Sequence, residues 1–138
     1  MKLAIMQPYI FPYIGYFQLI YAVDKFVIYD DVNYIKQGWI DRNKLLINRT
    51  ASIFKVPIQK ASSFKLIKET EINQSQYNFW LDKFLKSINH NYNKAPYFEE
   101  ISTLILNTFK KEYKTIDELA VESIFNTCKY LELDTNFV

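Results

Sequence analysis

The chain has 138 residues, of which 49% are hydrophobic and 17% aromatic, and its formal net charge is +2. These values predict one domain, residues 1–138, with a hydrophobic core. A single cysteine, Cys128, excludes an internal disulfide, and no apolar run approaches the roughly 20 residues of a membrane span. Because the N-terminus also lacks a secretory layout, the sequence predicts a cytoplasmic protein without a membrane span.

The N-terminal residues predict a strand, a loop, a helix and a second strand. An apolar run covers Leu3 to Met6, a helical pattern covers Tyr16 to Ala22, and a β-rich run covers Lys25 to Asp30. Pro8 and Pro12 keep regular structure out of the loop between the first two elements. Two strands joined by a helix imply a right-handed parallel crossover, and therefore an α/β fold with a Rossmann-like βαβ start.

The loop after the first strand is a candidate wall of a binding site. In open α/β sheets, ligands bind outside the carboxyl ends of the strands, where this loop lies. The candidate wall is Gln7 to Tyr16, and its Gly15 stands where a helix begins close to other backbone or to a ligand. An equally good interpretation is an aromatic turn that only packs the helix against the sheet.

The segment after the second strand, Asp30 to Asn43, concentrates polar and aromatic side chains. Its first two residues, Asp30 and Asp31, should share a sheet edge with the Gln7 loop, because the two strands are parallel. Two aspartates can bind Mg²⁺ through their carboxylate oxygens, or one of them can cap a turn, which is the commoner arrangement.

Positive charge gathers in the middle third of the chain. Residues 36–68 carry eight Lys or Arg and a single acid, Asp41. Such a segment can hold an anionic ligand such as a phosphate or diphosphate, or it can be a solvated hairpin face. The cations from Lys44 to Lys68 alternate with apolar residues and fit a solvated face, whereas Lys36 and Arg42 lie in a loop and fit a binding role.

Further strands are predicted to extend the sheet, in antiparallel pairing. Leu45–Ile47 and Ser52–Pro57 form a hairpin around a turn at Asn48–Thr50, and Phe64–Ile72 adds another strand.

The C-terminal half predicts three helices, because apolar residues recur at helical spacing over residues 77–88, 98–109 and 116–131. Pro96 fits the first position of the second of these helices, and Thr115 with Glu118 has the form of a capping box before the third. Cys128 is expected to be a buried small hydrophobe. His90, the sole histidine, is expected near a helix end and excludes a His-based metal cluster.

Common ligand-binding motifs do not occur in the sequence. It has no glycine-rich phosphate loop, no paired-cysteine zinc spacing and no basic helix suited to a DNA groove. We therefore expect no nucleic-acid partner.

Several blocks, in the right order, carry a resemblance to a known family. The runs IMQPYIFPYIGYFQLIYAVDKFVIYDDVNYIKQGWIDRNKL, LINRTASIFKVPI and NYNKAPYFEE resemble the WbqC-like family. Family members are generally longer, so the chain corresponds to about the N-terminal two-thirds of the usual length. The matching characteristic positions are Gln7, Pro8, Pro12, Gly15, Tyr16, Asp24, Asp30, Asp31, Tyr34, Lys36, Arg42, Asn43, Pro57, Tyr92, Lys94 and Tyr97.

The resemblance implies a bacterial protein of surface-polysaccharide (O-antigen) biosynthesis. The implied activity is transfer of glycine, or another aminoacyl or acyl group, to an amino sugar linked to a nucleotide or a lipid. Other enzymes of the same pathway are implied as partners, and Mg²⁺ and ATP as cofactors if the donor is activated with ATP.

Residue roles follow from this implied reaction. The catalytic candidates are Asp30, Asp31 and Lys36, with an aspartate as general base or Mg²⁺ ligand and Lys36 as a phosphate-holding cation. The substrate-binding candidates are Gln7, Pro8, Tyr9, Gly15, Tyr34, Trp39, Arg42, Asn43 and Lys94.

Two alternatives remain from other classes. One is a non-catalytic module that binds a sugar nucleotide or a pathway enzyme, because a fold does not decide function. The other is a relative of the Rossmann-like nucleotidylyltransferases, although their loop histidines have no counterpart here.

Overall fold

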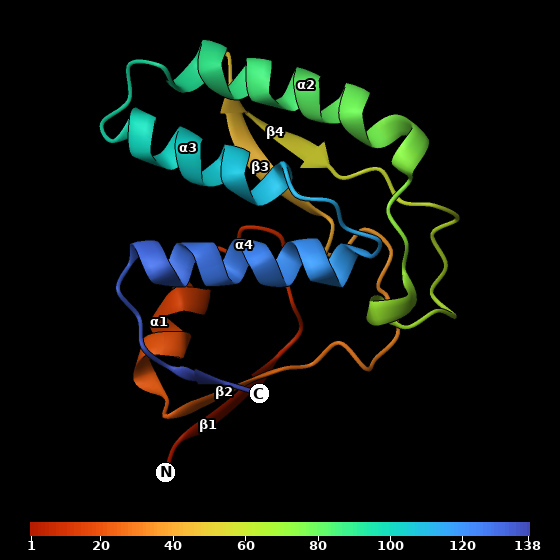
Figure 1. Ribbon diagram of the computed structural model, residues 1–138, viewed down its shortest axis with the longest axis vertical. Coiled ribbons are helices and arrows are strands. Elements are labelled where there is room, and N and C mark those ends of the chain that lie inside the picture. Colours follow the sequence, from red (N-terminus) through yellow and green to blue (C-terminus); the bar gives the residue numbers. More distant parts are fainter.

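The computed structural model describes residues 1–138. It contains a parallel sheet, a separate two-stranded hairpin and four α-helices (Figure 1). The first sheet contains β1 (Leu3–Met6), β2 (Lys25–Ile28) and β5 (Asn136–Phe137), all parallel and in the order β1-β2-β5. Helix α1 (Ile14–Ala22) connects β1 to β2, which confirms the βαβ start. This helix begins two residues earlier than the apolar pattern predicts.

Gly15 lies in the first turn of α1, and the neighbouring Tyr13 explains why a glycine stands there. A Cβ atom at this position would collide with the Tyr13 ring. The missing side chain therefore lets that ring lie close to the helix backbone.

The predicted hairpin is confirmed as β3 (Arg42–Ile47) and β4 (Thr50–Lys55), paired antiparallel. Its turn residues, Asn48 and Arg49, have φ values of 48° and 63°, which suit the right-handed twist of a two-residue hairpin. The prediction that these strands extend the parallel sheet is wrong, because the hairpin forms its own two-stranded sheet. It packs instead against α2, where the Phe54 and Phe84 ring centroids are 4.8 Å apart.

The strand predicted over Phe64–Ile72 is wrong. This stretch contains a single 3₁₀ turn, η1 (Ile67–Glu69), between isolated bridges. Within the turn and its end, the buried residues Ile67 and Thr70 are three positions apart, which matches the 3₁₀ period, and Ile72 is buried beyond it at an isolated bridge. The Glu69 carboxylate accepts a hydrogen bond from the Leu66 N–H and closes the turn.

Three helices in the C-terminal half are confirmed: α2 (Gln74–Tyr92), α3 (Phe98–Phe109) and α4 (Ile116–Tyr130). Pro96 does not occupy the first position of α3, because Tyr97 intervenes in the left-handed region and precedes the helix. None of these helices is both long and apolar enough to cross a membrane.

The N-terminus of α4 has the predicted capping box. The Thr115 N–H donates to the Glu118 carboxylate at 3.3 Å, and the Lys114 N–H donates to the same oxygen at 2.8 Å. Cys128, near the other end of this helix, is buried as expected.

Helix α4 joins two hydrophobic clusters. Its first half contributes Ile116 and Leu119 to the cluster under the hairpin, α2 and α3. Its second half contributes Ile124 and Cys128 to the cluster between α1 and the parallel sheet. The N-terminal loop lies where these clusters meet, because the Phe11 N–H donates to Ser123 Oγ in the middle of α4 at 3.0 Å.

Candidate functional site

The N-terminal loop is bound to the segment that leads into β3. The Ile10 N–H donates to the Ile40 carbonyl at 3.1 Å. In return, the Asn43 side-chain amide donates to the carbonyls of Ile10 at 3.2 Å and Phe11 at 2.6 Å. Two stretches far apart in sequence thereby form one surface.

The shared edge of the parallel sheet is also as predicted. The Tyr29 N–H donates to the Met6 carbonyl at 2.8 Å, so Gln7 and Asp30 leave the sheet at the same edge. The Tyr16 hydroxyl donates to the Gln7 carbonyl at 2.9 Å and fixes the first turn of the loop against α1.

A pocket of about 340 Å³ opens between the loop and the β3 segment, lined by Tyr9, Pro12, Tyr13, Trp39 and Asn43. Trp39 is 41% exposed. Two cations lie over its ring, with the Arg42 guanidinium carbon 5.4 Å and the Lys44 Nζ 5.7 Å from the centroid. The pocket therefore has an aromatic lining, and two cations contact one of its lining rings without lining the pocket themselves.

The two cations differ in their freedom to meet a ligand. Arg42 Nε donates to the Gly38 carbonyl at 3.0 Å, and a terminal nitrogen of Arg42 donates to the Gln37 carbonyl, so its guanidinium closes the loop before β3. Lys44 is exposed and forms no ion pair within the chain. From the sequence we assigned Lys44 to a solvated hairpin face and did not count it among the candidate site residues. Alternation along β3 places it on the same side of the strand as Arg42.

Asp41 is the one carboxylate with no solvent exposure, and in the sequence it lies between the pocket-lining residues Trp39 and Asn43. The buried Tyr34 hydroxyl donates to its Oδ2 at 2.8 Å, and Lys55 Nζ is 3.8 Å from the same oxygen. Its Oδ1 has no hydrogen-bond partner. Burial raises the pKa of the Asp41 carboxyl, against the lowering effects of the Tyr34 hydrogen bond and the Lys55 charge.

We expect Asp41→Asn to be more stable than the parent protein at neutral pH. In the parent protein, at pH values between the pKa of Asp41 in the unfolded chain and its higher pKa in the folded chain, the folded chain holds a proton that the unfolded chain has lost. The free energy of unfolding of the parent therefore falls as the pH rises toward the folded-state pKa. A neutral amide removes that loss. Urea unfolding from about pH 4 to about pH 8 should show a stability gain for the variant that vanishes at the acidic end.

The parent protein and the Asp41→Asn variant should both carry Asp117→Asn in this comparison, so that Asp41 is the buried carboxyl whose effect is measured. Burial, together with the nearby Asp30, raises the pKa of Asp117, so this residue contributes a pH dependence of the same sign. Parallel stability curves for the two proteins would contradict the role given to Asp41.

The adjacent aspartates lie in different surroundings. Asp31 forms an ion pair with Lys68 at 2.8 Å, and both side chains are largely exposed. Asp30 faces the N-terminal end of α4, close enough to Asp117 to influence its pKa. No group of three or more His, Cys, Asp or Glu side chains is arranged to hold a metal ion. Asp30 and Asp31 therefore belong to no larger ligand cluster, and their role as a pair of Mg²⁺ ligands stays a prediction.

The structure does not bring all of the predicted site residues to the pocket. Tyr34 is buried beneath it, Pro8 is buried in the loop, and Lys36 is exposed on the connection to β3. Lys94 lies on the connection between α2 and α3, close in sequence to Asn91, whose side chain accepts a hydrogen bond from the Asn48 N–H in the hairpin turn. The neighbouring Tyr92 hydroxyl accepts a hydrogen bond from the Leu46 N–H there, at 2.8 Å.

Comparisons with known proteins agree with the resemblance. Residues 7–138 match the model of the WbqC-like protein family. The chain is 33% identical over 136 residues to the uncharacterized protein Rv1507c of Mycobacterium tuberculosis. The match covers 97% of this chain and 58% of that protein, so the chain spans less than two thirds of its relative. No solved structure matches significantly.

Proposed function

Since the chain belongs to the WbqC-like protein family, we propose that it transfers an aminoacyl group, such as glycine, to an amino sugar carried on a nucleotide or a lipid. In this proposal the reaction serves bacterial surface-polysaccharide biosynthesis. The observation that carries the proposal is the aromatic pocket lined by Trp39, whose ring is also contacted by the cations Arg42 and Lys44.

The pocket suits both halves of such a substrate. A sugar ring has apolar C–H faces that pack on aromatic side chains, which Trp39, Tyr9 and Tyr13 supply. A diphosphate can bind the ammonium group of Lys44 and the guanidinium N–H groups of Arg42 that do not donate to the Gly38 and Gln37 carbonyls. Lys36 is a further exposed cation, on the connection between β2 and β3.

The proposed chemistry is attack of the sugar amine on the carbonyl of an activated aminoacyl donor. The nitrogen–carbon bond forms, the donor's leaving group departs with its electron pair, and a base takes the amine proton. We assign that base to Asp30, because Asp31 is held by Lys68 at 2.8 Å and Asp30 shares the Gln7 edge of the sheet. Asp30 does not line the pocket, so in this proposal the sugar amine extends from the pocket to that edge.

A second function, binding without catalysis, is favoured by one observation. No carboxylate, histidine or cysteine is among the residues that line the pocket. A module that holds the sugar carrier for another pathway enzyme needs the aromatic and cationic groups alone.

Product formation separates these two functions. The protein is incubated with glycine, ATP and Mg²⁺ and with an amino sugar linked through a diphosphate either to uridine or to a prenyl chain, and each sugar is examined by mass spectrometry. The aminoacyl transferase yields a glycyl amide that Asp30→Asn no longer forms. Binding without product, with every activated glycine donor tried, favours the binding module.

We expect Trp39→Ala to weaken binding of the uridine-diphosphate-linked sugar by about fivefold or more, because stacking on an aromatic ring contributes roughly 1–3 kcal/mol. Isothermal titration calorimetry measures the change, and the melting temperature should stay near that of the parent, since Trp39 is 41% exposed. Phe79→Ala is the matched control. That ring is 68% exposed and lies under Lys83 at 4.3 Å, on α2 and outside the pocket. An equal effect of both variants, or none from Trp39→Ala, contradicts the proposed pocket.

A further inference from the structure

The aromatic pocket continues past Tyr13 and Asn43 into a second hollow. These two residues line both the 340 Å³ pocket and a neighbouring cavity of about 270 Å³. The second cavity is largely apolar. It lies between the N-terminal loop, β3 and helices α2 and α3, and its apolar lining includes Phe11, Leu45, Phe54, Phe84, Ile88 and Ile105.

Lys44 stands at the junction of the two hollows. It lines the apolar cavity, and its Nζ also lies 5.7 Å from the centre of the Trp39 ring in the first pocket. Tyr13 forms the boundary, and its 68% exposed ring has room beside Gly15. Positive charge thus lies between an aromatic compartment and an apolar one.

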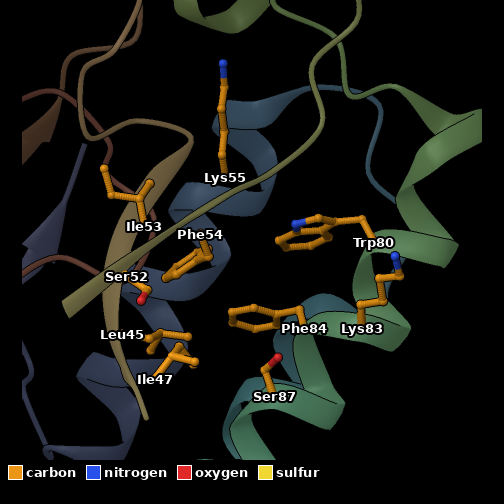
Figure 2. Close-up of a pocket in the computed structure, with 10 residues that line it drawn as sticks. All are labelled: Leu45, Ile47, Ser52, Ile53, Phe54, Lys55, Trp80, Lys83, Phe84 and Ser87. Carbon is orange, nitrogen blue, oxygen red and sulfur yellow. The ribbon is translucent and has the colours of Figure 1, made fainter. Parts of the chain in front are cut away.

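The apolar compartment rests on well-packed side chains. Figure 2 shows Phe54 and Phe84 pointing toward one another beneath β4, with Leu45 close by, and their ring centroids are 4.8 Å apart. Trp80 stacks on Phe84, with ring centroids 5.2 Å apart and 14° between the rings. A smaller hollow of about 240 Å³ lies along the same residues, between the hairpin and α2.

We propose that the sugar carrier bound at this site is a lipid, with its diphosphate at Lys44 and the first part of its prenyl or alkyl chain in the apolar cavity. The inference rests on the proposed function and chooses between its two carriers. A nucleotide would place a polar ribose and base against apolar side chains, where their lost hydration is not replaced. The amide group of Asn43, which also lines the apolar cavity, already donates to the carbonyls of Ile10 and Phe11 and is not free to bind a nucleotide.

The experiment compares one amino sugar joined through a diphosphate to three groups: methyl, a prenyl chain of about ten carbons, and uridine. Each buried methylene favours binding, so we expect the prenyl compound to bind the intact protein at least roughly tenfold more tightly than the methyl compound. The uridine compound should gain no such advantage. Calorimetry supplies all three dissociation constants.

Each outcome bears on a distinct claim. Equal affinity for the methyl and prenyl compounds, or tighter binding of the uridine compound, overturns the lipid assignment and leaves the proposed function standing. Failure of all three to bind overturns the proposed function together with the inference drawn from it.

A pair of variants on α3 tests the cavity itself. Ile105→Trp fills the apolar compartment and should reduce the affinity for the prenyl compound to that for the methyl compound, without changing the latter. Leu106→Trp is the matched control, because this neighbour is 39% exposed and does not line the cavity. An unchanged prenyl advantage in a folded Ile105→Trp protein contradicts the assignment. If that variant does not fold, the comparison of the three compounds on the parent protein decides.

Discussion

Phe109→Ala is expected to lower the free energy of unfolding by about 3–5 kcal/mol, the usual result of deleting a buried aromatic ring. Phe109 has no solvent exposure, and its ring centroid lies 5.1 Å from that of Phe84, 5.6 Å from Trp80 and 5.7 Å from Phe11. Because a domain of this size has only about 5–15 kcal/mol of stability, the variant should be close to unfolding. Urea denaturation followed by tryptophan fluorescence measures the change.

The exposed ring of Phe79 on α2 supplies the comparison. It is 68% exposed, so Phe79→Ala should change the free energy of unfolding by less than about 0.5 kcal/mol. A loss of similar size in the two variants would mean that the aromatic cluster around Phe109 does not organise the core. Since Phe11 belongs to the N-terminal loop, a weakened cluster should also loosen one wall of the apolar cavity.

Elements with a clear local period were predictable from the sequence. The parallel crossover followed from two apolar runs separated by a proline-bounded loop, and the three helices followed from their repeating apolar positions. The third strand of the parallel sheet, β5, was not predicted. Its two residues, Asn136 and Phe137, are too few to show any period, and they form a strand only because β2 offers a free edge.

The error over Phe64–Ile72 has a similar physical origin. Apolar and charged residues are mixed there in a way that fits a strand loosely, but the backbone finds its partners elsewhere. The Tyr34 N–H donates to the Lys65 carbonyl, and the Ile67 N–H donates to the Val32 carbonyl, both at 2.8 Å. These two bonds form a single antiparallel bridge between Asn33 and Leu66, and the 3₁₀ turn that begins at Ile67 ends the pairing there.

The location of the candidate site was more predictable than its side-chain contacts. Topology alone placed the Gln7 loop and Asp30 on one sheet edge. It did not indicate that Asp31 pairs with Lys68, or that Tyr34 turns inward to Asp41, because such contacts depend on rotamers and on the path of a long loop. The tethering of that loop by Asn43 also has no signature in the residue spacing.

Asn43→Asp is expected to destabilise the protein by about 3 kcal/mol, more than Asn43→Ala does, since hydrogen-bond losses cost about 1–3 kcal/mol. The amide of Asn43 faces the carbonyls of Ile10 and Phe11, at 3.2 and 2.6 Å, while its oxygen accepts the Lys44 N–H at 2.8 Å. A carboxylate keeps the acceptor but aims negative charge at two carbonyl oxygens. Alanine only removes the bonds. Urea unfolding at neutral pH ranks the two variants.

Protonating the new carboxylate of the Asn43→Asp variant separates the effect of charge repulsion from the effect of lost hydrogen bonds. Below about pH 4 the new carboxyl gains a proton that it can donate to one carbonyl, so the aspartate variant should approach or exceed the alanine variant in stability. Asn78→Asp is the control, because that exposed side chain on α2 forms no hydrogen bond within the chain and should change stability little. If the aspartate variant equals the alanine variant at every pH, Asn43 does not restrain the loop through its amide. If the predicted order holds, the same residue that separates the two compartments of the pocket also holds their shared wall in place.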